Sequence, residues 1–320
     1  MQIFRKERYP NGRRHIYFCG IKIFSYSKKR KLSKYDEIYA RRFDGLAPNE
    51  IRYCLEQQFM RSVGYPLNLD NPKTFNEKLQ WLKFYYRNPL MTKCADKVAV
   101  REYIKQKIGE KYLIPCIGVW DNPDDIDFDK LPDKFVLKVN WGSGQNIIVK
   151  DKSKLNVEST KKQLAEWMKP ESNHYYTFFE PCYKDIKPKI IAEKYLDFEE
   201  DLLDYKIMCY NGIPKNLFVC SERQSNLRVT FFDLDWNRLP FERKYSASNK
   251  KIARPEHLPK MLEIAKLLST PFPFVRVDFF CLKNKLYLGE LTFFPGAGIE
   301  KFEPQEWDRR LGDLLKLPKE

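Results

Sequence analysis

Lys138 lies in the middle of an apolar stretch and is followed by two closely spaced glycines. In "KFVLKVNWGSGQNIIVK", residues 134–150, the alternation from Phe135 to Val139 predicts a strand with its apolar residues on one face and Lys138 on the other. The loop that follows consists of Gly142, Ser143, Gly144, Gln145 and Asn146. Glycines in such a loop let backbone N–H groups close on a ligand, so the pattern indicates a lysine beneath a phosphate-covering loop. This stretch alone also fits an ordinary hairpin turn with a surface lysine.

Two acidic residues near the C-terminus, Asp278 and Glu290, lie in consecutive predicted strands, "FVRVDFF" and "KLYLGELTFF". If the three-residue turn 283–285 joins the strands, the numbers of paired residues sum to 568 and the two carboxylates face each other. A two-residue turn would put Glu290 on the other face. Facing carboxylates repel unless a cation lies between them, and Mg²⁺ is the natural candidate. The alternative is that Asp278 pairs with Arg276 or a lysine while Glu290 is solvated.

Several groups near this strand pair suit an anionic substrate. The strand that carries Glu290 ends in a tight loop, "FFPGAG", in which Gly296 and Gly298 can present backbone N–H groups to an anion. Arginine binds a carboxylate through two parallel hydrogen bonds, which makes it suitable for an acidic substrate. The arginine candidates are Arg223, Arg228 and Arg276.

These residues must be positioned by the helices and strands of the chain. The predicted helices lie mostly in its first part, and a mostly antiparallel sheet follows. Predicted helices cover 49–64, 74–86, 96–108, 159–169, 255–269 and 304–315. Predicted strands cover 112–120, 134–140, 146–150, 189–195, 205–210, 215–221, 229–233, 274–280 and 285–294. Thr74 and Glu77 have capping-box spacing at the start of the second helix, and Gly109 ends the third. We therefore predict an α+β fold.

The composition of the 320-residue chain is that of a folded protein with a basic N-terminal arm. Hydrophobic residues make up 43% and aromatic residues 15%, which excludes a disordered chain. The formal net charge is +15, and residues 1–34 alone contribute +10, with aromatic residues between the cations. This arm suits an anionic membrane surface, with a nucleic-acid-binding or purely structural arm as the alternatives.

The cysteine and hydropathy patterns predict a cytoplasmic protein. The eight cysteines include no C-x-x-C pair, and the three histidines are not placed with them at zinc spacing, so we expect reduced thiols. No run approaches the roughly 18 apolar residues of a membrane span. The stretch "HIYFCGIKIF" is interrupted by Lys22 and lacks a small-residue cleavage site. We expect peripheral contact with the inner face of the plasma membrane through the arm, and no nucleic-acid partner.

An ordered set of motifs carries a resemblance to a known family. The motifs are "ADK" at 95–97, "FVLKVNWGSGQN", "IIAEKYL" at 190–196, "DYKIMCYNG", "VRVDFF" and "GELTFFPG". Over about residues 70–310 the chain resembles the ATP-grasp superfamily, in the branch similar to the teichuronopeptide biosynthesis protein, with "TFNEKLQWLK" and "LPDKFVLKVN" specific to that branch. The resemblance implies two lobes with antiparallel sheets that clamp ATP. The expected segments are the arm (1–34), a helical region (35–130), a first lobe (131–200) and a C-terminal lobe (201–320).

The resemblance also implies an ATP site. Lys97 and Lys138 would contact the phosphates beneath the glycine loop, and Lys206 sits where the family often has a basic residue over the phosphates. Taken alone, Lys97 would more often be a solvated lysine on a helix, and Glu193 a surface charge at a strand edge. The adenine and ribose contacts implied by the resemblance are Glu193, the backbone around Lys194, Tyr195 and Leu196, and Glu200.

By the same resemblance, Asp278 and Glu290 would carry Mg²⁺. The family's usual third metal ligand is an asparagine two residues after the glutamate. Here that position is Thr292, whose hydroxyl would have to take its place. The third ligand and a two-metal arrangement are therefore the points at which this sequence departs from the family pattern.

The activity implied by the resemblance is that of an ATP-dependent carboxylate–amine ligase. The γ-phosphate of ATP goes to a carboxylate, and an amine then attacks the acyl phosphate to form an amide, while cations offset the phosphate charge. The catalytic candidates are Lys138, Lys206 and Arg276. The branch suggests a uronic acid of a bacterial surface polysaccharide as the carboxylate, and an amino acid or amino sugar as the amine. The alternatives are a glycosyltransferase or sugar kinase of polysaccharide assembly, and a basic binding module for nucleic acid or membrane.

Overall fold

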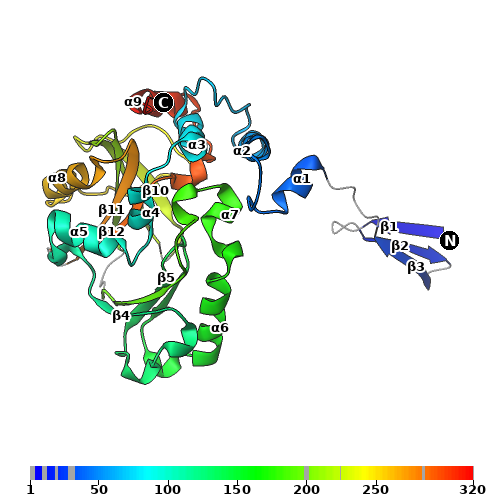
Figure 1. The fold of residues 1–320 in the computed structure, drawn as a ribbon, viewed down its shortest axis with the longest axis horizontal. Helices are drawn as coiled ribbons and strands as arrows, with labels where there is room; N and C mark the ends of the chain where they lie inside the picture. The colour runs from blue at the N-terminus through cyan, green and yellow to red at the C-terminus, as the bar shows by residue number, and fades with distance from the viewer. Residues whose placement is uncertain are drawn as a thin grey trace. The chain divides into compact units, whose positions relative to one another are not determined.

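The chain forms two compact units, residues 1–41 and 42–320, in a computed structural model (Figure 1). The structure describes residues 4–8, 13–18, 21–27, 33–197, 202–223, 225–282 and 285–319. In the first unit, β1 (Phe4–Arg8), β2 (Arg13–Phe18) and β3 (Ile21–Ser27) form an antiparallel sheet in that order. Helix α1 (Lys34–Tyr39) follows, capped by Ser33. None of the elements within the arm was predicted from the sequence.

The first sheet of the second unit has four antiparallel strands in the order β4-β7-β5-β6. The strands are β4 (Cys116–Trp120), β5 (Phe135–Val139), β6 (Asn146–Val149) and β7 (Ile190–Lys194). Phe135, Leu137 and Val139 are fully buried and Lys138 is half-buried, which confirms the predicted alternation. Lys138 pairs with Asn146 on β6 across the hairpin, so the strand pair holds the glycine loop directly above it.

The second sheet has five antiparallel strands in the order β10-β9-β8-β11-β12. The strands are β8 (Asp204–Tyr210), β9 (Ile213–Ser221), β10 (Arg228–Asp233), β11 (Phe274–Leu282) and β12 (Lys285–Thr292). Helix α8 (Leu258–Ser269) packs against β8, β9 and β11 (Figure 1). The two antiparallel sheets with their covering helices confirm the α+β fold.

The remaining helices of the second unit surround the two sheets. They are α2 (Pro48–Val63), α3 (Phe75–Tyr85), α4 (Pro89–Ala95), α5 (Val100–Ile108), α6 (Val157–Trp167), α7 (His174–Phe178) and α9 (Glu306–Leu314). The capping box predicted at Thr74 and Glu77 is present at the start of α3. Among the described residues, no helix combines the length and the apolar character needed to cross a membrane. The cysteines of the described part, from Cys54 onward, are free thiols.

The predicted helix over 96–108 is wrong at its start. Helix α4 ends at Ala95, and Asp96 adopts an extended conformation that interrupts the helix. The Asp96 carboxylate then accepts hydrogen bonds from Val98 N at 2.8 Å and Ala99 N at 3.3 Å before α5 begins. Lys97 therefore lies in the turn between two helices, not on a helix surface.

Candidate active site

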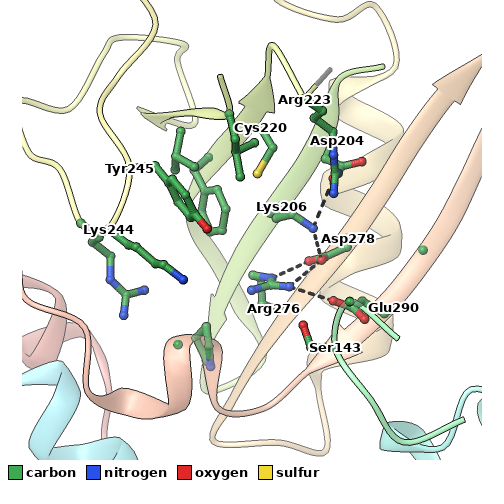
Figure 2. A pocket seen from close by; sticks show the side chains of 18 of the residues that line it. Ser143, Asp204, Lys206, Cys220, Arg223, Lys244, Tyr245, Arg276, Asp278 and Glu290 are labelled. Atoms are coloured by element: carbon green, nitrogen blue, oxygen red, sulfur yellow. Dashed lines mark hydrogen bonds and ion pairs between the residues drawn. The ribbon is translucent and has the colours of Figure 1, made fainter. Parts of the chain in front are cut away.

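A cavity of about 350 Å³ lies between the two sheets of the second unit (Figure 2). The first sheet contributes Lys138 and the loop of its β5–β6 hairpin, and the second sheet contributes side chains from β8, β11 and β12. The predicted site residues that line the cavity are Lys97, Lys138, Gly142, Ser143, Gly144, Asn146, Lys206, Arg223, Arg276, Asp278, Glu290 and Gly296. Residues up to two hundred positions apart in the sequence are thus brought to one site.

The β11–β12 hairpin does not have the predicted three-residue turn. The pair nearest the turn is Leu282 and Lys285, so the numbers of paired residues sum to 567 there, one less than predicted. In that register alone, Glu290 would lie on the face opposite to Asp278. A β-bulge just beyond Phe279 places one extra residue on β12 and changes the register.

Beyond the bulge, the predicted register returns. Arg276 pairs with Thr292, and Asp278 and Glu290 line the same cavity. Gly289 precedes Glu290 in the bulged strand, and a Cβ there would lie 2.7 Å from a neighbouring aromatic ring. The bulge therefore needs glycine at this position. The two carboxylates share the cavity, as predicted, but for a different structural reason.

Arg276 lies between the two carboxylates and binds both. Its guanidinium donates to both oxygens of Asp278 at 2.7 Å, to Glu290 Oε1 at 3.0 Å and to Thr292 Oγ1 at 3.0 Å. Lys206 on β8 also binds Asp278 (Figure 2). Asp278 therefore pairs with Arg276 and a lysine, as in the alternative to a metal, but Glu290, which that alternative left to solvent, binds Arg276.

The charges of this cluster hold Glu290 ionised. Burial by itself would raise the pKa of Glu290, but the positive charges of Lys97, Arg276 and Lys206 outweigh burial and lower the pKa to about 2. The pKa of Lys97 is lowered, because burial outweighs the attraction of Glu290. The pKa of Arg276 is raised, because Asp278 and Glu290 more than offset its burial. At neutral pH Glu290 is thus ionised and lies among basic side chains.

Lys138 forms an ion pair with Glu193 on β7. Lys138 Nζ lies 2.5 Å from Glu193 Oε2, and Arg101 Nη1 lies 3.1 Å from Oε1 of the same carboxylate. Because β7 lies between β4 and β5, Glu193 is an interior strand residue, and its interpretation as a strand-edge surface charge is wrong. An ammonium has three donors, so Lys138 can hold Glu193 and still donate to a ligand. Arg101 was not predicted, because nothing in its helix distinguishes it from a surface arginine.

The two glycines of the loop above Lys138 meet different constraints. Gly144 has a φ of +72°, which L-residues rarely adopt, and a Cβ at Gly142 would overlap the side chain of Gln145. Lys97 Nζ donates to the carbonyl of Gly142 at 2.5 Å, and Lys97 N donates to Asn140 O at 3.0 Å. The turn that carries Lys97 is therefore attached directly to the loop.

A second, more apolar pocket of about 480 Å³ adjoins the cavity at the end of β7. Lys138, Asn146 and Arg223 line both spaces, so the two are neighbours. The predicted residues Glu193, Lys194, Tyr195 and Leu196 line this pocket. Its apolar walls come from Ile114, Val136, Ile148, Leu202 and Phe280. A flat apolar ligand with a charged tail would suit the two spaces together.

Helix α3 holds the loop that follows β12 through a buried polar stripe. Asn76, Gln80 and Lys83 lie about one turn apart and are at most 1% exposed. The hydrogen bonds are Asn76 Nδ2 to Glu300 O at 2.8 Å, Gln80 Nε2 to Ala297 O at 2.9 Å and Gly298 O at 2.8 Å, and Lys83 Nζ to Ala297 O at 2.6 Å. The loop's carbonyl groups are thus bound on the side of α3.

The loop's two glycines have different roles. Gly296 has a φ of +60° and lines the cavity. Gly298, with a φ of +61°, packs on α3, where a Cβ would lie 2.7 Å from Gln80 Nε2. Gly298 is therefore not one of the cavity-lining residues, although the sequence suggested it as a substrate contact.

Three further predicted residues are not among those that line the cavity. Arg228 lies on the edge strand β10, whereas its neighbours Leu227 and Val229 line the cavity. Thr292 reaches the site only through its hydrogen bonds with Arg276 and Glu290. Glu200 falls outside the described residues. Cavity residues that the sequence analysis missed include Asp204, Cys220, Arg243, Lys244 and Tyr245.

The donor set at the cavity suits a hard divalent cation in its chemistry. Asp278 and Glu290 are oxygen ligands on one face, and the low pKa of Glu290 keeps its carboxylate ionised. Within the described ranges, no three His, Cys, Asp or Glu side chains gather to form a closed metal site. A cation at this pair would share the two carboxylates with Arg276 and Lys206.

Comparisons with known proteins address the fold and the family. Similar solved structures include a D-alanine–D-alanine ligase from Bacillus anthracis (19% identity, TM-score 0.37, 64% of this chain and 58% of that chain). Others are an L-amino acid ligase from Bacillus licheniformis (13% identity, TM-score 0.45, 77% and 56%) and the Bacillus anthracis enzyme complexed with ATP (15% identity, TM-score 0.40, 89% and 96%). The chain thus spans less than two thirds of the length of the first two.

No curated protein matches the sequence significantly. The family described as TupA-like ATPgrasp matches residues 77–316, which include both sheets of the second unit and every residue placed in the cavity. The chain belongs to the TupA-like ATP-grasp family.

Proposed function

We propose that the protein is an ATP-dependent carboxylate–amine ligase. The observation that carries the proposal is the convergence of Lys97, Lys138, Lys206 and Arg276 with two carboxylates in a cavity between two sheets. Phosphoryl transfer depends mainly on positioning and on neutralising the charge of the phosphates, and these side chains suit that task. The adjoining apolar pocket is the expected place for the adenine, with the backbone of residues 194–196 at its edge.

The reaction has two steps. A substrate carboxylate oxygen attacks the γ-phosphorus of ATP, the bond to the β-phosphate oxygen breaks, and ADP leaves. The neutral amine then attacks the acyl carbon, the amide forms, and inorganic phosphate leaves with the proton that the nitrogen loses. Lys138 and Lys206 hold the phosphates, and Arg276 orients Asp278 and Glu290 and offsets charge on the transferred group.

Asp278 and Glu290 are the residues that would hold Mg²⁺, with the Thr292 hydroxyl as the candidate third ligand. When bound, the ion would neutralise part of the charge on the phosphates. The Thr292 hydroxyl already donates a hydrogen bond to Glu290 Oε1 at 3.2 Å and accepts one from Arg276. Among the proposed metal ligands, this hydroxyl therefore lies next to Glu290.

We further propose that the substrate belongs to bacterial cell-surface polysaccharide synthesis, of capsule, teichuronopeptide or exopolysaccharide type. The name of the matched family supports this choice. The carboxylate would then be that of a uronic acid in a polysaccharide precursor, and the amine that of an amino acid or amino sugar. The basic residues of the arm, 1–34, would bring the protein to the anionic cytoplasmic face of the membrane, where lipid-linked precursors are assembled.

The experiment is to incubate the protein with Mg-ATP, a panel of uronic acids and a panel of amino acids and amino sugars, and to measure ADP release. A ligase releases ADP only when a carboxylate and an amine are both present. Release with a sugar alone and without amide formation indicates a sugar kinase instead. A protein that neither binds nor hydrolyses ATP with any pair is not a ligase of this kind.

A further inference from the structure

Arg243 and Lys244 form an end of the cavity away from Asp278 and Glu290. Both line the cavity together with Tyr245. Figure 2 shows Lys244 and Tyr245 on the opposite side from Glu290 and Ser143. We propose that this end binds an acidic group of the substrate, a carboxylate other than the one that is phosphorylated. The inference rests on the proposed function, and it defines the substrate as a molecule with a second acidic group.

Arg243 is buried, and some of its hydrogen-bond donors have no acceptor among the described residues. Its side chain is 6% exposed, its guanidinium stacks on Phe302 at 4.8 Å, and its Nη2 lies 3.3 Å from Glu300 Oε2. Within the described part of the chain, its Nε and Nη2 atoms are shielded from solvent and have no hydrogen-bond partner. Buried donors without acceptors cost free energy. A ligand carboxylate in the cavity would compensate the charge of this guanidinium fork from the side that lines the cavity.

The loop that carries Arg243 is fixed by hydrogen bonds on both sides. Before it, Glu242 and Glu303 exchange two backbone hydrogen bonds, of 2.8 and 2.9 Å. After it, Val229 N donates to Ser246 O at 3.1 Å. The position of Arg243 is therefore set by the backbone on both sides, as a preorganised binding residue requires.

The distribution of charge also favours an anion at this end. Lysine and arginine side chains that line the cavity outnumber the carboxylates by three. Asp204, Asp278 and Glu290 pair with cations on their own side of the cavity. At the other end, Glu300 lies beside Arg243 and lines the cavity together with Lys244. The phosphates of a bound nucleotide would neutralise the basic side chains near Asp278 and Glu290. The positive charge of Arg243 and Lys244 would remain available for a second anion.

The test uses malonate as a dicarboxylate probe on the full-length protein with the Mg²⁺ complex of a non-hydrolysable ATP analogue bound at saturation. Malonate is titrated at constant ionic strength, and the rise of the melting temperature is recorded. The variants are R243Q, R243K, which keeps the positive charge over Phe302, and R309Q as a control on the exposed face of α9. Analogue binding is measured separately for each variant.

The expected result is saturable stabilisation of the unaltered protein and of R309Q. Malonate affinity should fall at least about tenfold in R243Q and by a smaller factor in R243K, because lysine keeps the charge but lacks the fork. Equal malonate affinity in all four proteins would overturn the inference, as would binding of inorganic phosphate but not malonate. Failure of the analogue to bind the unaltered protein would instead overturn the proposed function. Should R243Q not fold, R243K decides the question.

Discussion

Replacement of Lys138 by alanine tests whether Lys138 binds a phosphate of ATP or only neutralises the charge of Glu193. The change removes an ammonium that lies 2.5 Å from Glu193 Oε2, while Arg101 stays 3.1 Å from Oε1. The side chains of Lys138 and Glu193 are 23% and 12% exposed. Breaking an exposed pair costs about 0–1 kcal/mol and breaking a buried pair about 3–5. With Arg101 retained, we expect a loss of about 1–2 kcal/mol, which lowers the melting temperature by roughly 2–8 °C.

The catalytic effect should be much larger than the effect on stability. Loss of one preorganised donor to the transferred phosphate typically slows a reaction by about 10²–10³-fold. The assay is ADP release together with the affinity for Mg-ATP. Lys134→Ala is the matched control, because Lys134 precedes the same strand and pairs with exposed Asp197 at 2.5 Å. It should change neither quantity.

A double-mutant cycle with Glu193→Gln tests the counter-ion explanation. If Lys138 serves only to neutralise Glu193, then the double variant Lys138→Met, Glu193→Gln should recover the activity of the unaltered protein. If Lys138 binds phosphate, the double variant stays as slow as Lys138→Ala. Full nucleotide affinity and full activity in Lys138→Ala would refute the assignment altogether.

Three further predictions concern other parts of the chain. Glu290→Gln should raise the Mg²⁺ concentration needed for ADP release and slow the reaction. The pKa of Glu290 is about 2 in the folded protein, below its ordinary value of 4.5, so the ionised carboxylate stabilises the fold above about pH 4.5. This contribution to the free energy of unfolding should disappear as the pH falls from 4.5 to 2. The Glu290→Gln variant should not show this loss. Burial lowers the pKa of Lys83 from 10.5 to about 8, so the unfolded chain binds more protons between these values; unfolding measurements should show stability rising with pH in that window, and Lys83→Met should lack the rise. The arm should give salt-sensitive binding to vesicles with anionic lipid, measured by co-sedimentation, which removal of residues 1–34 abolishes without changing nucleotide affinity; vesicle binding that is indifferent to salt or to the truncation would rule out this role.

Local patterns predicted the strands of the second unit well, because burial on one or both faces leaves a direct signal in the sequence. The alternation around Lys138 is the clearest case, since the apolar residues and the lysine lie on the faces expected. The arm shows the opposite outcome. It was predicted only as a basic arm with aromatic residues, and no element was predicted within it, although Ile21 and Ile23 alternate with Lys22 at the start of the observed strand β3. A dense set of cations concealed a period-2 pattern.

Tertiary features were harder to predict from the sequence. The bulge next to Gly289 depends on how two strands pair, and a turn length of one residue more or less decides the face of Glu290. Arg243 gave no signal, because its role depends on Glu300 and Phe302, about sixty positions away. For Lys97 a signal existed, since Asp96 is a residue type that favours the start of a helix, and Asp96 does precede α5.

The buried stripe of α3 makes helix α9 part of the site's scaffold. Asp308 on α9 accepts hydrogen bonds of 2.9 Å from both the backbone and the side-chain nitrogen of Asn76. Lys78 Nζ donates to Gly312 O and Leu315 O, each at 2.7 Å. Helix α9 therefore supports α3, and α3 in turn holds the loop beside the cavity. A deletion that removes α9 would thus be expected to inactivate the protein, although α9 supplies none of the described residues that line the cavity.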